Sequence, residues 1–428
     1  MLLQNLRASW RSIRKHRFHS ILNIFGFSFA LTVVILLGMF VQRELSTNMF
    51  HDNVKQIYKV YSWGAPYPLG ETLRTHVPEM ENLTMVRVEK RVATAIYEEK
   101  PAMATYYLET DNNFFEVFTF PIVQGDAKEP LTLPNSVVIT ESLARRLFGD
   151  EDPVLKNIGI LEMGGAQLVI TAVVKDPPLN SSIKFDMLLR ADPDKPVQGG
   201  RMADSWSTYY YEFFVKLPKG QNIETLNEKN QGVVARNSNM QPDFIERVKL
   251  FPFKDLYFNP GGLYTRMAGG DHGKVMAMMW IGIIILLVSI INFFNLSTAS
   301  GMLRSKEIGL RKINGSTRGM IMTQFVAESV ILTFVSMIIA IGVANLLIPW
   351  FGRFVGAEYH VIMMDKWWAW LLLPGGSLTV GLFAGSYPAV VLSKTDPINA
   401  LYTGRDTTGF GVVAMRRILV VFQLVVSI

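Results

Sequence analysis

Nucleotide-binding or catalytic chemistry requires residues of particular types at fixed spacing, and one string in this chain comes near to such a pattern. Residues 269–274 read Gly-Gly-Asp-His-Gly-Lys. A phosphate-binding loop of the form Gly-x4-Gly-Lys-Ser/Thr would require glycine at the position of Ala268 and a hydroxyl side chain at that of Val275. The pattern therefore fails at two positions, and we do not expect this segment to bind a nucleotide.

The other chemically suggestive residues are weaker candidates. Residues 373–377, Leu-Pro-Gly-Gly-Ser, resemble an ATPase signature string, but they lie in an apolar run, where proline and glycine are expected to kink a membrane helix. The chain has no cysteine, which excludes disulfides and thiolate metal sites. Four histidines lack metal-ligand spacing and a nearby Gly-x-Ser-x-Gly elbow, so we expect surface or packing roles for His51, His76, His272 and His360. We predict no catalytic, cofactor-binding or metal-binding residues in this chain.

The most informative segment is a short cationic stretch between two long apolar runs, at residues 304–318. A helix beginning near its first residue would place charged side chains around an apolar tip that could enter a groove on a partner protein. The candidate coupling residues are Arg304, Lys306, Glu307, Ile308, Leu310, Arg311, Lys312 and Ile313, with Ile308, Leu310 and Ile313 forming the tip. The alternative is that these cations only fix membrane topology, which needs positive charge but no particular order.

Long uncharged windows predict membrane helices, because a crossing takes about 20 helical residues. Four windows qualify, at residues 18–42, 275–303, 329–352 and 367–393. We predict helices at 20–42, 276–300, 325–350 and 367–392, and a truncated fifth helix from 418. Since that last apolar run is cut off at Ile428, we expect a fragment of a longer protein that continues into a second half. Glu328, near the inner end of the third span, is an intramembrane polar residue expected to pair with a loop cation or to cap its helix.

Charge distribution predicts the orientation. Residues 1–19, 304–318 and 394–417 together carry 14 Lys/Arg and 3 acidic residues, a net charge of +11. The net charge of the whole chain is only +6, so the remaining residues sum to −5. By the positive-inside rule these three segments are cytoplasmic, and the residues between 43 and 274 face outward. The sequence pI of about 9.2 therefore reflects topology, and no nucleic-acid motif accompanies it.

The first 19 residues are predicted to form an amphipathic cytoplasmic elbow helix at the membrane surface. Leu3, Leu6, Trp10 and Ile13 recur at helical spacing, with arginines on the other side. A solvated helical tail is the alternative. The following apolar run is longer than a signal-peptide core and no small-x-small cleavage site follows it, which favours an uncleaved anchor.

The outward domain, residues 43–274, is predicted to be mixed α/β, with a break between two lobes near residues 192–200. Thr140 should cap a helix over 141–148 that Gly149 ends. Two more helices are expected at 69–77 and 222–236. Short runs rich in β-branched and aromatic residues predict strands at 56–61, 85–92, 136–139, 167–174, 209–217 and 247–253.

Several segments resemble one protein family. Residues 304–318 followed by Gln324-Phe-Val-Ala-Glu328-Ser are similar to the signature of FtsX-like permeases of the MacB type in ABC transporters. Residues 5–29 resemble the family's amino-terminal elbow and first helix. Residues 136–149 and 171–185 resemble the MacB periplasmic core domain. Residues 384–401 resemble the fourth helix and the segment that follows it. The string Lys-Glu-Ile-Gly-x-Arg-Lys is specific, and Asn314 is a departure, since the family has a small apolar residue there.

The resemblance implies an α-helical multi-pass protein of the inner membrane, with the large mixed α/β domain inserted between spans 1 and 2. A separate ABC ATPase dimer would use ATP and drive two permease halves or copies. Its closure would be transmitted through the membrane to move the extracytoplasmic domains, a mechanism called mechanotransmission, for export or extraction of substrates. A periplasmic adaptor and membrane lipid are further implied partners. Two other readings stay open: a division-type regulator that activates a cell-wall hydrolase, and a membrane-anchored hydrolase with a spatial active site.

Overall fold

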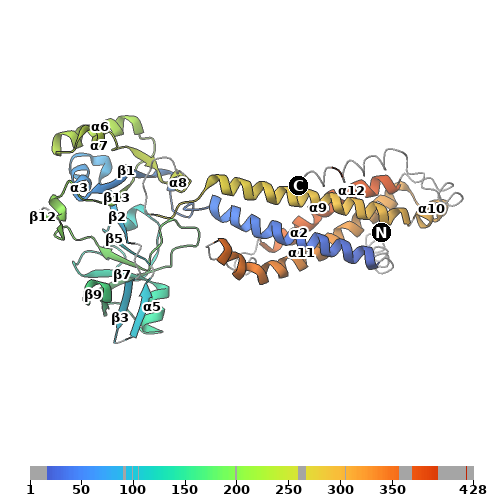
Figure 1. Cartoon of the computed structure of the whole chain (residues 1–428), viewed down its shortest axis with the longest axis horizontal. Coiled ribbons are helices and arrows are strands. Elements are labelled where there is room, and N and C mark those ends of the chain that lie inside the picture. Colours follow the sequence, from blue (N-terminus) through green and yellow to red (C-terminus); the bar gives the residue numbers. More distant parts are fainter. Residues whose placement is uncertain are drawn as a thin grey trace. The chain divides into compact units, whose positions relative to one another are not determined.

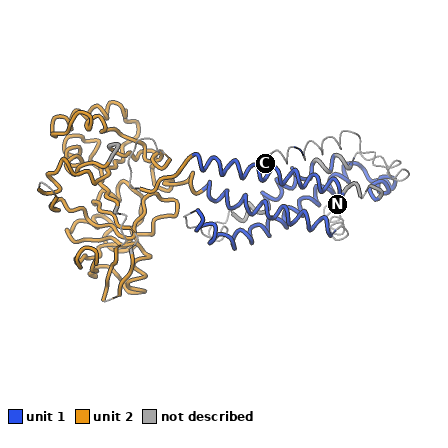
Figure 2. Tube along the Cα trace, in the orientation of Figure 1, with its two compact units in different colours: residues 1–42, 273–428 blue, residues 43–272 orange. Residues whose placement is uncertain are grey.

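The computed structural model describes residues 17–89, 93–98, 100–104, 106–197, 200–258, 267–303, 305–355, 369–393 and 421. The chain separates into two compact units (Figures 1 and 2). Unit 1 comprises residues 1–42 and 273–428, and unit 2 comprises residues 43–272. The bounds of unit 2 lie close to those predicted for the outward domain, residues 43–274.

Unit 2 is built on one 12-stranded sheet with the order β14-β1-β13-β2-β5-β10-β7-β9-β8-β3-β4, and β6 pairs with β9 off this path (Figure 1). The strands of this sheet are β1 (Ile57–Pro66), β2 (Leu83–Glu89), β3 (Ala93–Tyr97), β4 (Lys100–Ala104), β5 (Tyr107–Thr110), β6 (Ile122–Gly125), β7 (Ser136–Thr140), β8 (Asn157–Ile160), β9 (Ala166–Val174), β10 (Met187–Arg190), β13 (Tyr209–Lys216) and β14 (Leu250–Pro252). Strands β11 (Pro196–Val197) and β12 (Gly200–Arg201) form a separate hairpin. The segment predicted to divide two lobes is thus a small hairpin within one compact unit.

Most strand pairs in this sheet are antiparallel, but two central pairs are parallel. These are β5 with β10, where Leu108 pairs with Leu188, and β7 with β9, where Ile139 pairs with Val173. Strands in such central positions are covered on both faces and therefore carry continuous apolar runs. Every residue of β7 is buried accordingly.

Helices and short turns cover the sheet of unit 2. They are α3 (Tyr67–His76), α4 (Phe114–Val117), α5 (Glu141–Phe148), α6 (Ile223–Asn237), α7 (Pro242–Ile245) and α8 (Phe253–Leu256), with single 3₁₀ turns at Val54–Gln56, Pro78–Met80, Leu161–Met163 and Met202–Asp204. The three helices predicted from sequence are confirmed as α3, α5 and α6. Thr140 accepts a hydrogen bond from the N–H of Leu143, and Gly149 ends α5 with a φ of 64°.

Unit 1 consists of helices α2 (Arg17–Leu45), α9 (His272–Leu303), α10 (Ser305–Ile313), α11 (Arg318–Val355) and α12 (Ala369–Ser393) among the residues described. Three of them, α2, α9 and α11, have segments long and apolar enough to cross a membrane. The fourth apolar helix, α12, has 25 residues. The elbow at 1–19 lies outside the described residues for all but its last three positions, and so does the fifth span for all but Val421, so a count of four spans plus a fifth stays a prediction.

Small residues bring α11 and α12 into close contact. A Cβ atom on Gly381 would lie 2.5 Å from Thr333 Oγ1, and one on Gly385 would lie 2.7 Å from the Cβ of Ser329. Without a hydrophobic drive between helices in lipid, such close backbone approach is a main source of helix association. One apolar cluster of unit 1 gathers side chains from four helices, namely Phe27, Leu31, Phe293, Leu332, Ala340 and Ala384.

Candidate functional site

The candidate site is α10, the short helix between the long apolar helices α9 and α11. Its sequence suits a single short helix, since Glu307 lies in the first turn while Arg311 and Lys312 lie in the last, as the helix dipole favours. Gly315 then takes a φ of 89° and donates its N–H to the carbonyl of Lys312 at 3.1 Å. A left-handed glycine of this kind is a common helix terminator, and it allows the chain to turn into α11.

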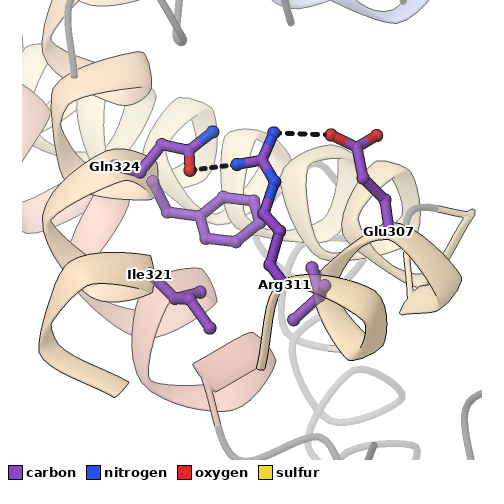
Figure 3. A pocket seen from close by; sticks show the side chains of 6 residues that line it. Glu307, Arg311, Ile321 and Gln324 are labelled. Carbon is purple, nitrogen blue, oxygen red and sulfur yellow. Dashed lines mark hydrogen bonds and ion pairs between the residues drawn. The ribbon is translucent and has the colours of Figure 1, made fainter. Parts of the chain in front are cut away.

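Arg311 connects α10 to α11. Its Nη1 donates to Gln324 Oε1 at 2.6 Å, and its Nη2 donates to Glu307 Oε1 at 2.8 Å (Figure 3). The pair with Glu307 has the i,i+4 spacing and both side chains are partly exposed, so it contributes only about 0.3–0.5 kcal/mol. Its main effect is geometric, because a guanidinium held on both sides fixes the position of α10 against α11.

Lys312 connects α10 to α12. Its Nζ donates to the main-chain carbonyl of Ser393 at 2.7 Å, and Ser393 is the last residue of α12. A cation is favourable at this end of a helix, where the carbonyl groups of the last turn lack intrahelical partners. The short helix is therefore hydrogen-bonded to the two apolar helices that follow it in the chain.

The structure corrects the predicted apolar tip. Ile308 is only 5% exposed and packs with Ile321, Phe325 and Ala389, whereas Leu310 and Ile313 are 53% and 60% exposed. At 3.6 residues per turn, Ile308 and Leu310 point about 200° apart, so they cannot share one face. Ile308 anchors α10 to its neighbours, and the exposed tip consists of Leu310 and Ile313.

A small recess lies where α10 meets α11, lined by Glu307, Ile308, Arg311, Ile321, Gln324 and Phe325 (Figure 3). Its volume of about 10 Å³ is room for about one water molecule, so it cannot hold a nucleotide. In the described part of the chain, no group of three or more His, Asp or Glu side chains could hold a metal ion.

The remaining predicted residues are only partly placed. Arg304 lies outside the described residues, and Lys306 belongs to α10 with its side chain undescribed. Glu328 is half-buried on α11, one turn beyond Gln324, and its predicted pairing with a loop cation stays a prediction. Sequence reasoning missed Gln324 and Ser393 as partners of the loop. Gln324 could have been found from the sequence, because it is a polar residue one helical turn before Glu328, near the start of an apolar helix.

Comparisons with known proteins match two segments of the chain. Residues 20–232 match the family model of the MacB-like periplasmic core domain, and residues 279–397 match that of the FtsX-like permease C-terminal region. The uncharacterized ABC transporter permease YknZ of Bacillus subtilis is 24% identical over 430 residues, which cover 94% of this chain and 99% of that protein.

Two further similar proteins carry the name MacB. The macrolide export ATP-binding/permease protein MacB of Bdellovibrio bacteriovorus is 36% identical over 269 residues, covering 62% of this chain and 38% of that protein. The crystal structure of the periplasmic region of MacB from Actinobacillus actinomycetemcomitans aligns with a TM-score of 0.33 and 12% identity, covering 46% of this chain and 87% of that one.

Proposed function

Because this chain belongs to the ABC transporter permeases of the MacB/FtsX type, we propose that it couples ATP hydrolysis by a separate ATPase to movement of its extracytoplasmic domain. The movement would serve export or extraction of substrates. The observation that carries this proposal is α10, which presents Leu310 and Ile313 outward while Arg311 and Lys312 bind it to α11 and α12. A partner that moves α10 would move two apolar helices with it.

The proposed partners follow from this role. An ABC ATPase dimer would bind α10 from the cytoplasm and would consume the ATP, since this chain lacks a complete phosphate-binding loop. A second permease half or copy would provide the other α10. The protein would reside in the inner membrane with residues 43–272 outside, where a periplasmic adaptor could bind.

Truncation of the exposed tip tests the proposal. Burying a Leu or Ile side chain stabilises a contact by about 1.5–3 kcal/mol, and both tip residues are about half exposed in the free chain. Replacing Leu310→Ala and Ile313→Ala together should therefore cost roughly 2–4 kcal/mol of docking energy, or about thirty-fold to a thousandfold in affinity. The measurement is ATPase stimulation and binding in reconstituted membranes, with the ATPase that copurifies with the chain.

A matched control is Leu155→Ala, which truncates a 77% exposed leucine in the outward domain and should leave ATPase stimulation unchanged. Membrane insertion of the double variant should also be normal, because the flanking cations that set topology remain. Full stimulation by the Leu310→Ala, Ile313→Ala chain would mean that the motor docks elsewhere and that the loop serves as a topological anchor.

A further inference from the structure

Two chain segments connect unit 2 to the apolar helices, and both are hydrogen-bonded to one loop of the unit. The first segment consists of the last turn of α2 and the residues that follow it, and the second precedes α9. The loop comprises residues 178–184, between the strands β9 and β10. The contacts lie entirely within unit 2, to which residues 43–45 of α2 also belong.

The last turn of α2 and the segment that follows it are held by side chains as well as by the backbone. Arg43 donates to the carbonyl of Leu179 through Nε at 3.2 Å and Nη2 at 3.0 Å. Asn180 Nδ2 donates to the carbonyl of Ser46 at 2.8 Å. The N–H of Asn48 donates to the carbonyl of Asn180 at 2.8 Å, so both chains contribute donors.

Asn48 and Ser182 form the centre of this contact. The Nδ2 of Asn48 donates to Ser182 Oγ at 2.8 Å, and the N–H of Ser182 donates to Asn48 Oδ1 at 2.8 Å. Asn48 is fully buried and takes a φ of 64°, a conformation that Asn tolerates better than most residues. Both ends of the Asn48 side-chain amide are therefore hydrogen-bonded within the protein, as is usual for a buried polar group. A non-glycine residue with a positive φ is strained, and it persists only where the surrounding contacts hold it in place.

The segment that leads into α9 is bonded to the same loop. The N–H of Ala268 donates to the carbonyl of Ser182 at 3.1 Å, and the N–H of Gly270 donates to the carbonyl of Tyr257 at 2.8 Å. The hydroxyl of Tyr257 in turn donates to Glu44 Oε2 at 2.8 Å, in the last turn of α2. A side chain at Gly270 would displace the Tyr257 ring, since a Cβ would lie 2.4 Å from that ring.

The loop continues directly into the centre of the sheet. Ile183 and Phe185 are buried in the cluster that contains Phe114 and Phe120, and Phe185 makes edge contacts with both of those rings. The next strand, β10, pairs with β5 on one side and β7 on the other. We therefore expect a displacement of the loop to be passed to β10 and to the strands that pair with it.

We propose that Asn48, Asn180 and Ser182, with Arg43 and Ala268 bonded to the same loop, form a joint that passes movement of the membrane helices to the central sheet. Because the joint bonds both connecting segments to a single loop, movement at the end of α2 and movement at the start of α9 would displace the same part of the domain. Asn48 and Ser182 are positioning residues of this joint. The functional half of the inference rests on the proposed function, while the structural half can be tested without any ATPase.

The structural test uses hydrogen exchange of the full chain in nanodiscs. Asn48→Gly removes the side chain and still accommodates the positive φ, so the loss is specific to the two hydrogen bonds with Ser182. We expect at least tenfold faster exchange at the amide of Ser181, which donates to the carbonyl of Pro178 within the loop, and also at that of Ala268, which donates to the carbonyl of Ser182. Faster exchange near position 48 alone would overturn the joint. Ser182→Ala should show the same pair of effects if Asn48→Gly does not fold.

The matched control is Thr84→Ala, which removes the hydrogen bond from the buried Thr84 of β2 to Asp111, away from the loop. It should leave exchange at Ser181 and Ala268 unchanged. A change of equal size in the control would show that the joint amides report general destabilisation, and the inference would fail.

The functional test adds the copurifying ATPase and a fluorophore on Leu155→Cys, in a chain that otherwise has no cysteine. Asn48→Gly should keep ATPase stimulation, since α10 is untouched, but should lose most of the ATP-dependent fluorescence change of the domain. A full fluorescence change in this variant would overturn the joint as the route of movement. Absence of ATPase stimulation in the unmodified chain would instead refute the proposed function, and the exchange result would still decide the joint.

Discussion

His51 makes the stability of the outward domain dependent on pH. The imidazole is 3% exposed and is surrounded by the rings of Phe50, Phe118, Phe120 and Phe253, with ring centroids 4.0–5.7 Å away. Its Nδ1 accepts a hydrogen bond from the N–H of Thr119 at 3.1 Å, which places the proton of the neutral ring on Nε2. A second proton would bring a charge into this apolar site, and burial accordingly lowers the pKa of His51 to about 3.

The magnitude follows from proton linkage. The unfolded chain binds a proton at His51 below pH 6.5, whereas the folded domain does so only below about pH 3. Between these values folding releases one proton, so the free energy of unfolding falls by about 1.4 kcal/mol for each unit by which the pH is lowered. Acidification from pH 7 to pH 5 should therefore remove about 2 kcal/mol of stability through His51 alone.

The assay compares the unmodified chain with His51→Gln, whose amide does not titrate. Hydrogen exchange of the slowest amides of β13, corrected for intrinsic rates, gives the opening free energy at pH 7 and pH 5 in nanodiscs. His51→Gln should start from a lower stability but should lack the 2 kcal/mol difference in its pH dependence. His76→Gln, at an exposed histidine, is the matched control. Equal pH dependence in the His51→Gln and unmodified chains would refute the reasoning.

Three further changes test other contacts. Gly381→Leu should force α11 and α12 apart and lower the thermal stability of the membrane helices, whereas Gly375→Leu, on the same helix with open space around it, should have little effect in the same melting experiment. Thr140→Ala should destabilise the outward domain by about 1 kcal/mol through loss of the α5 cap, and Thr140→Ser should retain most of that energy in hydrogen-exchange measurements. Lys312→Met should release α10 from the end of α12 and speed amide exchange over residues 305–313, and unchanged exchange there would show that the Ser393 contact does not hold the helix.

Local patterns predicted the elements that carry their own signals. The cap and the terminating glycine of α5 are encoded within ten residues, and β13 is rich in aromatic residues, so both were found. The strands β3 and β4 were missed because Ala, Lys and Glu are frequent in and around them, and these residues have low strand propensity. Strand β10 was also missed, because it has only four residues and its extended form depends on pairing with β5 and β7.

The site shows the same division. The order of charges along residues 304–313 predicted a short helix with charge around apolar side chains, and the structure contains that helix. The sequence could not show that Lys312 bonds to Ser393, since the two are 81 positions apart and meet only through the packing of α11 against α12. The tip was misassigned at Ile308 because apolar residues were grouped without regard to the 100° turn per residue.

The place of β13 in the sheet sets the order in which the outward domain can be made. Strand β1 pairs with β13 on one side and with β14 on the other, and β2 also pairs with β13. During synthesis, β1 and β2 are therefore made long before β13, the strand that joins them, and each has an unpaired edge until then. Such pairing between distant segments is slow, and open edges attract other strands. The newly made domain is thus most exposed to misassembly between the synthesis of residue 89 and that of residue 216.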